Sequence, residues 1–533
     1  MLSGGPPVTP KHSTIQRALK AATSGLTFVD TQEHERFFSF PDLYARARQA
    51  AGALRERGVK RGDRVAIVLP TCVEFMDAFF GALLAGAVPV PLYPPVRLGR
   101  LDEFHARTAR MLELTQPRLV LSDARIGKFL RVRSERVEYG EPYEDPGAPD
   151  DLALIQFSSG TTVDPKPVAL THANVLANVA AIDTIVPPDD AQAGVSWLPL
   201  YHDMGLIGCL LLAVAHPGPL TLIPPEVFLA RPALWLRAIS RKRATLSVAP
   251  NFAYGLCARR IRDEELEGVD LSSWRFALNG AEPVAPGVLR RFADRFARFG
   301  FDEKALMPVY GLSEASLAVT FTPPRRGPRT IQSGRRELAS VGAPLPGVDV
   351  DLRDGRIFVR GPSVMREYFG NPEATRDTLK DGWLDTGDLG FVEDGELFVS
   401  GRAKDVIIVA GRNHAPQEFE DALDGLPGVR PGCAVAVGRP GDEGEELVLL
   451  VEQSDDLAAD AVSARVVERT GIRPNAVQLL APGTLPRTSS GKLRRAEALR
   501  QLMADELKPP DKVTLLHLAK EAARSMLARP RRP

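Results

Sequence analysis

Apolar positions along the first two thirds of the chain switch repeatedly between two spacings. From Phe40 to Gly58 they recur every three or four residues, which predicts a helix that ends at the glycine. The next apolar stretch, Val65–Pro70, is short and continuous, which is typical of a strand buried on both faces. A helix over Val73–Ala85 follows, and further strands are predicted to begin at Val88, Leu119, Leu220, Thr245 and Trp274. This alternation predicts an α/β fold with parallel-rich sheets wrapped by helices.

The pattern changes after about Ser340. Short alternating strands and turns, such as those that begin at Asp349 and Gly395, predict a smaller β-rich lobe over about residues 340–403. Beyond this lobe, strands are predicted from Val406, Cys433, Leu447 and Ala476, and helices over Pro416–Leu426 and Ala458–Thr470. We therefore predict an N-terminal domain of residues 1–403 and a small α+β C-terminal domain of residues 404–533. The first residues are expected to form a loose arm, and the segment from Lys508 a helix with a basic end.

Composition favours a globular protein that does not bind nucleic acid. The chain of 533 residues is too long for one hydrophobic core, and its 44% hydrophobic and 25% charged residues are ordinary for globular domains. Lys and Arg together number 67, as do Asp and Glu, so no overall field attracts nucleic acid or an anionic membrane. We expect no nucleic acid partner.

Cysteine usage and apolar stretches favour a cytoplasmic protein. The cysteines are Cys72, Cys209, Cys257 and Cys433. Their wide spacing argues against a zinc site or a disulfide framework, and the N-terminal residues lack the pattern of a signal peptide. Two apolar stretches, Phe75–Tyr93 and Leu206–Ala215, are expected to be core. Asp77 and two prolines interrupt the first, and the second is shorter than the ~20 residues that span a bilayer, so no transmembrane segment is expected.

The segment Leu154–His172 runs from a predicted strand through a loop of small hydroxyl residues into a helix that begins near Thr171. Hydroxyls and backbone N–H groups beside a glycine can wrap polyphosphate oxygens, and Lys166 adds a cation. The candidate phosphate-binding residues are Ser158, Ser159, Gly160, Thr161 and Thr162. The Walker pattern GxxxxGK[ST] is absent from the sequence, which excludes a P-loop hydrolase. By itself the loop is equally consistent with ordinary turn chemistry.

Six further segments occur in the order and approximate spacing found in one known superfamily. They are SWLPLYHDMGLIG from Ser196, NGAEPV from Asn279, YGLSEAS from Tyr310, WLDTGDLG from Trp383, GRAKDVIIVAGRN from Gly401 and PRTSSGKLRR from Pro486. With the phosphate loop, they resemble the adenylate-forming enzymes, which include acyl-CoA synthetases and luciferases, over nearly the whole chain. The resemblance implies a large N-terminal domain, a small mobile C-terminal domain and a two-step reaction. A carboxylate and ATP give acyl-AMP and pyrophosphate, and a thiol or other acceptor then takes the acyl group.

The resemblance assigns roles to residues of these segments. Lys492 is similar to the lysine that bridges the carboxylate and the α-phosphate, where two anions meet and their charge must be neutralised. Asp388 is expected to accept hydrogen bonds from the ribose hydroxyls with help from Arg402. Tyr310, which Gly311 follows, is similar to the aromatic residue that stacks on adenine. The wall beside the base is expected to comprise Asn279, Gly280, Ala281, Glu282 and Pro283.

Further residues are implied for the metal, the gate, the hinge and the acyl chain. Glu314 and Thr162 are the expected contacts of Mg²⁺, which prefers hard oxygen ligands. His202 resembles the gate beside the acyl tunnel of the family. Lys404 lies where the family has its hinge, about which the small domain would rotate and carry Lys492 in and out. The acyl-pocket candidates are Phe252, Ala253 and Gly208, which would suit core packing equally well.

Three stretches resemble fatty acyl-AMP ligases more than ordinary acyl-CoA synthetases. They begin at Trp197, Ala249 and Ile408. A lysine is usual near Ile408 in CoA ligases, so this apolar side chain weakens a CoA interpretation. However, the stretch Pro323–Leu338 is short for the insertion that restrains the small domain in fatty acyl-AMP ligases, so CoA use stays open.

The leading expectation is a fatty acyl-AMP ligase that uses ATP, Mg²⁺ and a fatty acid. Since residues 508–533 carry no attachment motif, the acceptor is expected to be an acyl carrier protein in trans with a phosphopantetheine thiol. A fatty acyl-CoA synthetase that uses CoA is the alternative. Val163 and Pro167 depart from the family's loop, because a β-branched residue resists a left-handed conformation and proline removes a backbone donor. A non-catalytic relative that binds an acyl or nucleotide ligand is therefore the third hypothesis.

Overall fold

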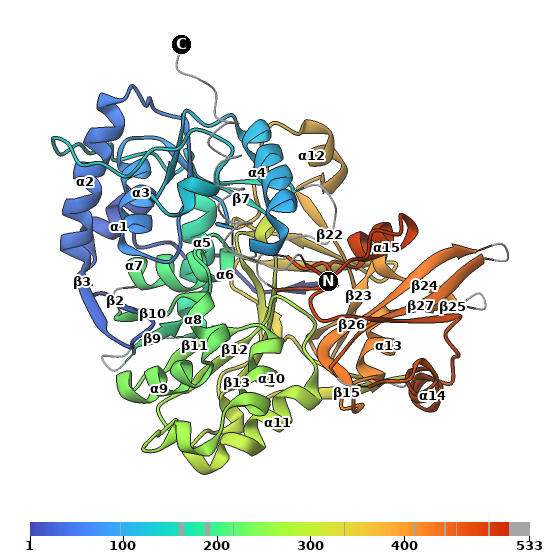
Figure 1. Cartoon of the computed structure of the whole chain (residues 1–533). Coiled ribbons are helices and arrows are strands. Elements are labelled where there is room, and N and C mark those ends of the chain that lie inside the picture. Colours follow the sequence, from blue (N-terminus) through green and yellow to red (C-terminus); the bar gives the residue numbers. More distant parts are fainter. Residues whose placement is uncertain are drawn as a thin grey trace.

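A nine-stranded sheet lies at the centre of the larger lobe of the computed structural model (Figure 1). The structure describes residues 1–95, 98–158, 165–186, 192–216, 218–334, 336–409, 412–441, 444–454, 456–488 and 491–510. The strands, in their order across the sheet, are β17 (Ala343–Pro344), β14 (Ala318–Phe321), β13 (Leu306–Gly311), β12 (Phe276–Asn279), β11 (Leu246–Ala249), β9 (Gly194–Ser196), β10 (Leu220–Leu222), β2 (Gly25–Val29) and β3 (Glu35–Ser39). The six strands from β13 to β2 are parallel, β3 and β14 join them antiparallel, and β17 pairs antiparallel with β14. The predicted α/β fold with parallel-rich sheets is confirmed.

Helices cover this sheet and the sheets beside it. They are α1 (Ile15–Ala21), α2 (Phe40–Glu56), α3 (Val73–Leu84), α4 (Leu101–Thr115), α5 (His172–Ile185), α6 (Asp203–Gly205), α7 (Leu212–Ala215), α8 (Pro225–Ala230), α9 (Ala233–Lys242), α10 (Asn251–Arg260), α11 (Pro286–Phe296) and α12 (Pro372–Thr378). Short 3-10 turns lie at Leu98–Arg100, Ile126–Phe129, Asp263–Leu266, Ala297–Phe299, Glu303–Ala305 and Ser313–Ala315. The predicted helices after Phe40 and Val73 are confirmed as α2 and α3. Helix α2 has clear local causes at both ends, since Ser39 caps it by accepting from the Asp42 N–H and Gly58, just beyond its end, has a φ of 77°.

The two apolar stretches that resembled membrane segments are core. Helix α3 is buried along almost its whole length, and its Asp77 carboxylate accepts hydrogen bonds from Arg46 Nε at 3.0 Å and Tyr139 Oη at 2.7 Å. The second stretch forms a π-helix over Leu206–Leu211, followed by α7. Within the described part of the chain, no helix has both the length and the apolar character that a bilayer crossing requires.

Two three-stranded sheets lie beside the central sheet, and one of them contains the strands on either side of the proposed phosphate loop. One is parallel, β5 (Val88–Pro91), β4 (Arg64–Val68) and β6 (Leu119–Ser122), and the other is antiparallel, β20 (Glu367–Tyr368), β8 (Pro167–Thr171) and β7 (Leu152–Phe157). The proposed phosphate loop therefore connects two antiparallel strands, whereas the sequence predicted that this loop would be followed by a helix that begins near Thr171. Thr171 still caps α5, with its side chain accepting from the Asn174 N–H.

A six-stranded antiparallel sheet forms the β-rich lobe. Its strands are β1 (Leu2–Ser3), β18 (Asp349–Arg353), β19 (Arg356–Arg360), β22 (Trp383–Glu393), β21 (Leu379–Lys380) and β23 (Glu396–Arg402), and a separate hairpin is formed by β15 (Thr330–Ser333) and β16 (Arg336–Ala339). The predicted lobe is present, but the prediction of a loose N-terminal arm is wrong. Residues Leu2 and Ser3 pair with β18, because this edge strand offers unpaired backbone groups.

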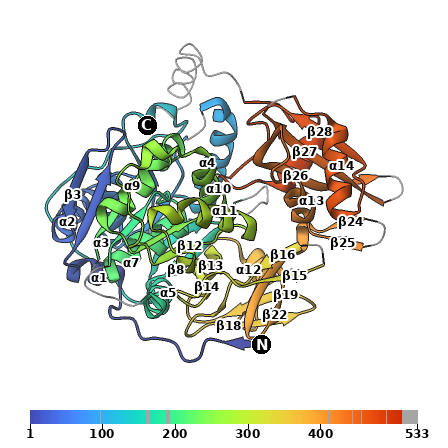
Figure 2. The same ribbon diagram turned by 90° about the horizontal axis from the view of Figure 1, so that it is seen from below.

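The small lobe begins after β23, and Figures 1 and 2 show it beside the larger lobe. It comprises the turn Ala403–Asp405, β24 (Ile407–Val409), β25 (Arg412–His414), α13 (Pro416–Ala422), β26 (Val429–Gly441), β27 (Gly444–Gln453), α14 (Ala459–Thr470), β28 (Ala476–Leu480) and α15 (Arg495–Met503). Its two apolar clusters start at Ile407 and Cys433, on the C-terminal side of Lys404. We retain residues 1–403 and 404–533 as the proposed domains. The helix expected from Lys508 lies mainly outside the described residues.

Candidate active site

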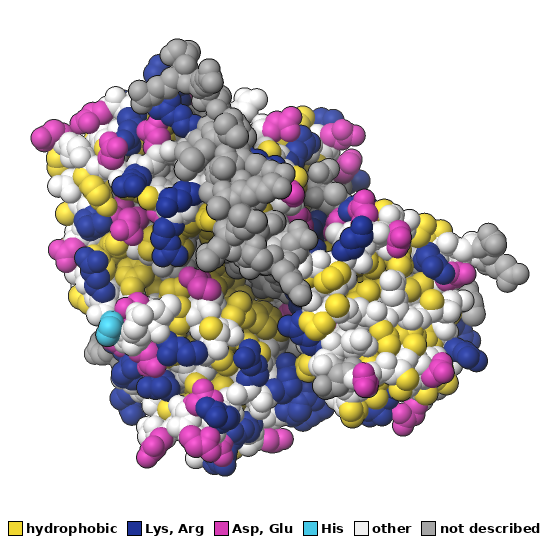
Figure 3. Space-filling view, viewed as in Figure 1, with side chains coloured by type: hydrophobic (Ala, Val, Ile, Leu, Met, Phe, Trp, Pro, Cys, Tyr) yellow, Lys and Arg dark blue, Asp and Glu magenta, His cyan; other side chains and the backbone are white. Residues whose placement is uncertain are grey.

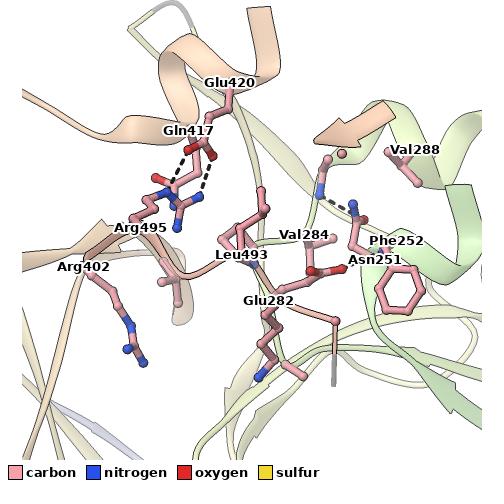
Figure 4. A pocket seen from close by; sticks show the side chains of 18 of the residues that line it. Asn251, Phe252, Glu282, Val284, Val288, Arg402, Gln417, Glu420, Leu493 and Arg495 are labelled. Carbon is pink, nitrogen blue, oxygen red and sulfur yellow. Dashed lines mark hydrogen bonds and ion pairs between the residues drawn. The ribbon is translucent and has the colours of Figure 1, made fainter. Parts of the chain in front are cut away.

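A cavity of about 2260 Å³ lies between the two domains. Figure 3 shows the two lobes side by side, with Lys and Arg side chains where they meet, and Figure 4 shows side chains of both domains turned toward the cavity. The predicted residues that line it are Ser158, Lys166, His202, Gly208, Phe252, Ala281, Glu282, Pro283, Tyr310, Gly311, Glu314, Asp388, Arg402, Lys404 and Lys492. Ser159, Gly160, Thr161 and Thr162 lie outside the described residues, as does Val163. The structure thus brings most of the predicted side chains to one space.

Tyr310, Asp388 and Arg402 form one hydrogen-bonded group. Tyr310 Oη donates to Asp388 Oδ2 at 2.7 Å, and Arg402 Nε donates to Asp388 Oδ1 at 2.9 Å. Asp388 and Arg402 face each other across the β22–β23 pair, which fixes their distance through the strand register. An ionised carboxylate has about four acceptor sites, so Asp388 can bind ribose hydroxyls in addition to its two protein donors.

The segment after β12 builds only part of the predicted adenine wall. Ala281, Glu282 and Pro283 line the cavity, whereas Asn279 is fully buried at the end of β12 and Gly280 packs closely against Val309. The structure therefore corrects the prediction that Asn279 and Gly280 line the adenine wall, because neither lines the cavity. Glu282 Oε1 accepts from the Phe252 N–H at 2.6 Å, and burial raises the pKa of its carboxyl group.

Glu314 lies beside Tyr368, which the sequence did not single out. Tyr368 Oη donates to Glu314 Oε1 at 2.8 Å, and Lys166 Nζ lies 4.7 Å from the centre of the Tyr368 ring. Burial raises the pKa of the Glu314 carboxyl group, although Tyr368 and two cations oppose this shift. A magnesium ion would relieve this cost of burying the carboxylate, and Mg²⁺ bound to phosphates needs only one or two protein carboxylates. Glu314 fits that requirement. The described residues contain no group of three or more potential metal ligands.

His202 and Asp203 form a buried pair at the start of α6. His202 Nδ1 lies 2.6 Å from Asp203 Oδ1, and Ser313 Oγ donates to the other carboxylate oxygen. Burial alone would raise the pKa of Asp203, but His202, Ser313 and Lys492 together hold that pKa well below its ordinary value. The sequence motif YHDMG indicated the histidine, whereas the contact with Ser313 depends on the packing of β13 against this turn.

Lys492 reaches the cavity from the C-terminal domain. Its loop is closed by two hydrogen bonds, from the Thr488 N–H to the Lys492 carbonyl at 2.8 Å and from the Lys492 N–H to Thr488 Oγ1 at 3.0 Å. Burial lowers the pKa of its ammonium group, and the carboxylates of Asp203 and Glu282 oppose that shift. Because both carboxylates belong to the N-terminal domain, the site is completed across the domain boundary.

Gly208 and Phe252 both line the cavity, Gly208 beside Leu317 and Phe252 beside the Lys492 loop. Gly208 lies in the π-helix, where a Cβ would approach Leu317 Cδ2 to 2.7 Å. Trp197, another lining residue, stacks on Phe228 with 3.9 Å between ring centres. Ala253, the third predicted residue of the acyl pocket, is instead fully buried in the hydrophobic core. Helix α10 turns it away from the cavity that its neighbour Phe252 lines.

The Tyr310–Asp388–Arg402 group, the apolar lining residues and a lysine from the small lobe together match the site expected of an adenylate-forming enzyme. The family model described as AMP-binding enzyme matches residues 16–369. A putative acyl-CoA synthetase of Caulobacter vibrioides is 35% identical and covers 92% of this chain and 95% of its own. The long-chain-fatty-acid–AMP ligase FadD32 of Mycolicibacterium smegmatis is 32% identical, over 86% of this chain and 88% of its own.

A solved structure from a study of fatty acyl-adenylate ligases from E. coli and L. pneumophila has the same fold. It superposes with a TM-score of 0.88 at 33% identity and covers 94% of this chain and 99% of its own. The chain therefore belongs to the AMP-binding enzyme family, and it is an ATP-dependent ligase that forms acyl-adenylates. The resemblance recognised in its motifs is confirmed.

Proposed function

We propose that this enzyme activates a fatty acid as its acyl-adenylate and then passes the acyl group to the phosphopantetheine thiol of an acyl carrier protein. The observation that carries the proposal is that Lys492 of one domain shares a cavity with the Tyr310–Asp388–Arg402 group and the apolar residues around Gly208. A fatty acid could therefore lie with its carboxylate near the lysine and its chain toward the apolar end. The similarity to fatty acyl-AMP ligases supports this choice of substrate.

In the first step, a carboxylate oxygen attacks the α-phosphorus of ATP. A new oxygen–phosphorus bond forms, and the bond from the α-phosphorus to the bridging oxygen of the β-phosphate breaks, so that pyrophosphate leaves. Lys492 would neutralise the carboxylate and the α-phosphate as they approach. Tyr310 would stack on adenine, and Asp388 would hold the ribose.

Phosphate and metal binding would use three further residues that line the cavity, Ser158, Lys166 and Glu314. Ser158 and Lys166 line it, on either side of the proposed phosphate loop, and Glu314 would contact Mg²⁺. When bound, this ion would neutralise phosphate charge. Thr162 remains the second proposed contact of the ion.

In the second step, the acceptor thiolate attacks the acyl carbonyl and AMP leaves. We propose that Lys404, which is exposed in the turn Ala403–Asp405, is the hinge that lets the small domain move between the two steps. The four cysteines are free thiols, which agrees with our proposal of a cytoplasmic location.

CoA is the second candidate acceptor, and one observation favours it. The stretch Pro323–Leu338 forms little more than the β15–β16 hairpin, from which Arg336 donates to the Ser400 carbonyl at 2.9 Å. This hairpin is short for the insertion of fatty acyl-AMP ligases. The two acceptors therefore require a direct comparison.

The proposal is tested by incubating the protein with ATP, Mg²⁺ and saturated fatty acids of increasing length, followed by detection of pyrophosphate and acyl-AMP. We expect acyl-AMP to accumulate when no thiol is present. A holo acyl carrier protein and CoA are then added in parallel. Faster consumption of acyl-AMP by CoA would replace the carrier hypothesis, and no acyl-AMP with any chain length would leave the binding-only hypothesis.

Replacing Gly208 by leucine should shorten the acyl chains that the enzyme accepts. The new side chain would extend toward Leu317 and fill the apolar end of the cavity. We expect kcat/KM for dodecanoate to fall by about 10- to 100-fold, since each methylene in an apolar pocket contributes about 1–3 kcal/mol. Butyrate serves as the internal control and should keep its kcat/KM. A uniform loss for both acids would contradict the proposed direction of the chain.

A further inference from the structure

The N-terminal end of α4 contacts both segments that flank the Lys492 loop. Arg100 Nη2, in the turn before the helix, donates to the carbonyls of Gly483 at 3.0 Å and Thr484 at 2.8 Å. On the other side of the loop, Arg494 Nη1 donates to Glu103 Oε1 at 2.9 Å. Figure 2 shows α4 at the edge of the larger lobe that borders the small lobe. One helix end of the N-terminal domain thus holds the loop from two directions.

The pair of Glu103 and Arg494 is more buried than other ion pairs between the domains. The Arg494 side chain is 3% exposed and that of Glu103 31%. In the pair of Arg291 and Asp424, the corresponding values are 50% and 40%. Exposed pairs contribute little, whereas a buried guanidinium that loses its carboxylate is strongly disfavoured. The orientation of the small domain seen here therefore depends on Glu103 far more than on Asp424.

Contacts between described residues tie Arg494 and Lys492 to the same loop. The Arg494 N–H donates to the Pro486 carbonyl at 3.0 Å, and the Thr488 N–H donates to the Lys492 carbonyl at 2.8 Å. A bridge between Arg487 and Leu493 closes the same turn. A shift of Arg494 relative to the N-terminal domain must therefore shift Lys492 relative to the substrate.

We propose that Glu103 is a positioning residue for adenylate formation, acting through Arg494 to place Lys492 in the cavity. This inference rests on the proposed activation of a fatty acid. In the orientation seen here, the contact joins the two domains while Lys492 lines the cavity, and a rotation about the proposed hinge at Lys404 would separate Glu103 from Arg494. Its role is thus confined to the first step and to its reversal by pyrophosphate.

Glu103→Gln provides the test, because this half-exposed residue can be replaced without leaving a cavity in the core. We expect kcat for acyl-AMP formation to fall by about 10- to 100-fold, since a misplacement of about 1 Å can cost 10²-fold. KM for ATP and for the fatty acid should stay within about twofold of wild type. ATP formation from supplied acyl-AMP and pyrophosphate should fall equally, whereas acyl transfer from supplied acyl-AMP to CoA or holo carrier protein should be unchanged.

Asp102→Asn is the matched control, since it neutralises the neighbouring exposed carboxylate of α4, which pairs with Arg131 of the same domain, and should leave both steps unchanged. The exchanged pair E103R/R494E should recover at least about tenfold of the activity lost by E103R alone. Adenylation within twofold of wild type in E103Q, equal loss of both steps, or no recovery in the exchanged pair would each overturn the proposal. If the wild-type protein forms no acyl-AMP, the proposed function fails instead.

Discussion

Replacing Lys492 by alanine should abolish most acyl-adenylate formation and leave acyl transfer from supplied acyl-AMP largely intact. Lys492 lies on a loop of the C-terminal domain that reaches the cavity containing the Asp388 group, and the carboxylates that raise the pKa of its ammonium group, such as Asp203 and Glu282, belong to the other domain. Loss of a preorganised charge of this kind typically lowers the rate by about 10²- to 10³-fold. Pyrophosphate release with a fatty acid measures the first step, and disappearance of supplied acyl-AMP in the presence of thiol measures the second.

The pH dependence of the wild-type enzyme sharpens this test. Burial lowers the pKa of Lys492, so its positive charge is lost at a lower pH than that of an exposed lysine. The adenylation rate should accordingly fall as the pH rises through this lowered pKa, and the residual rate of Lys492→Ala should lack that decline. Lys492→Arg, which keeps a charge at every accessible pH, is the matched variant. Equal loss of both steps in Lys492→Ala would contradict the separation of roles.

Replacing Asp388 by alanine should raise KM for ATP by about 10- to 100-fold. The carboxylate would lose its bonds to the ribose, and hydrogen bonds to a charged group contribute about 1.5–3 kcal/mol each. The change would also leave Tyr310 and Arg402 without the acceptor that orients them at 2.7 and 2.9 Å. Initial rates over a range of ATP concentrations at saturating fatty acid measure the effect.

Tyr310 provides the comparison for Asp388. Tyr310→Phe keeps the ring that would stack on adenine and loses only the bond to Asp388, so KM for ATP should rise by less than about tenfold. KM for the fatty acid should change little in Asp388→Ala, because this residue lies away from the apolar end around Gly208. A larger effect on the fatty acid than on ATP would contradict the assignment of Asp388 to the ribose.

The sequence predicted site residues where the motif itself contains the chemistry, and these predicted residues line one cavity. Tyr310, Asp388, Arg402 and Lys492 stand in short segments whose residue types and spacing are typical of adenylate-forming enzymes. The sequence did not indicate Tyr368 as a site residue. This residue lies in a two-residue strand and contacts Glu314 because β20 pairs with β8. Its importance comes from a contact between distant segments, which local spacing does not encode.

The direction of a side chain was the commonest cause of error. Asn279 and Ala253 stand beside lining residues, Ala281 and Phe252, yet both are fully buried. Asn279 is the last residue of β12, whereas Ala281, with a φ of 71°, lies in the turn beyond the strand. Ala253 and Phe252 are neighbours on a helix, where successive residues are rotated by about 100°. A motif predicts which segment lies near the cavity. Which residues of that segment face the cavity depends on how its helix or strand packs in the tertiary structure.

The sequence by itself determined the alternation of helices and strands, the change to a β-rich lobe and the class of enzyme. These follow from local periodicity, from caps such as Ser39 and Thr171, and from motifs whose members are close in the chain. The tertiary structure alone decided the π-helix at Gly208, the pairing of the N-terminal strand with β18 and the contact between Glu103 and Arg494. Glu103 and Arg494 are 391 positions apart in the sequence, so their contact depends on how the two domains pack. Local backbone geometry fixes elements, whereas burial of apolar surface and pairing of charges between distant elements fix the site.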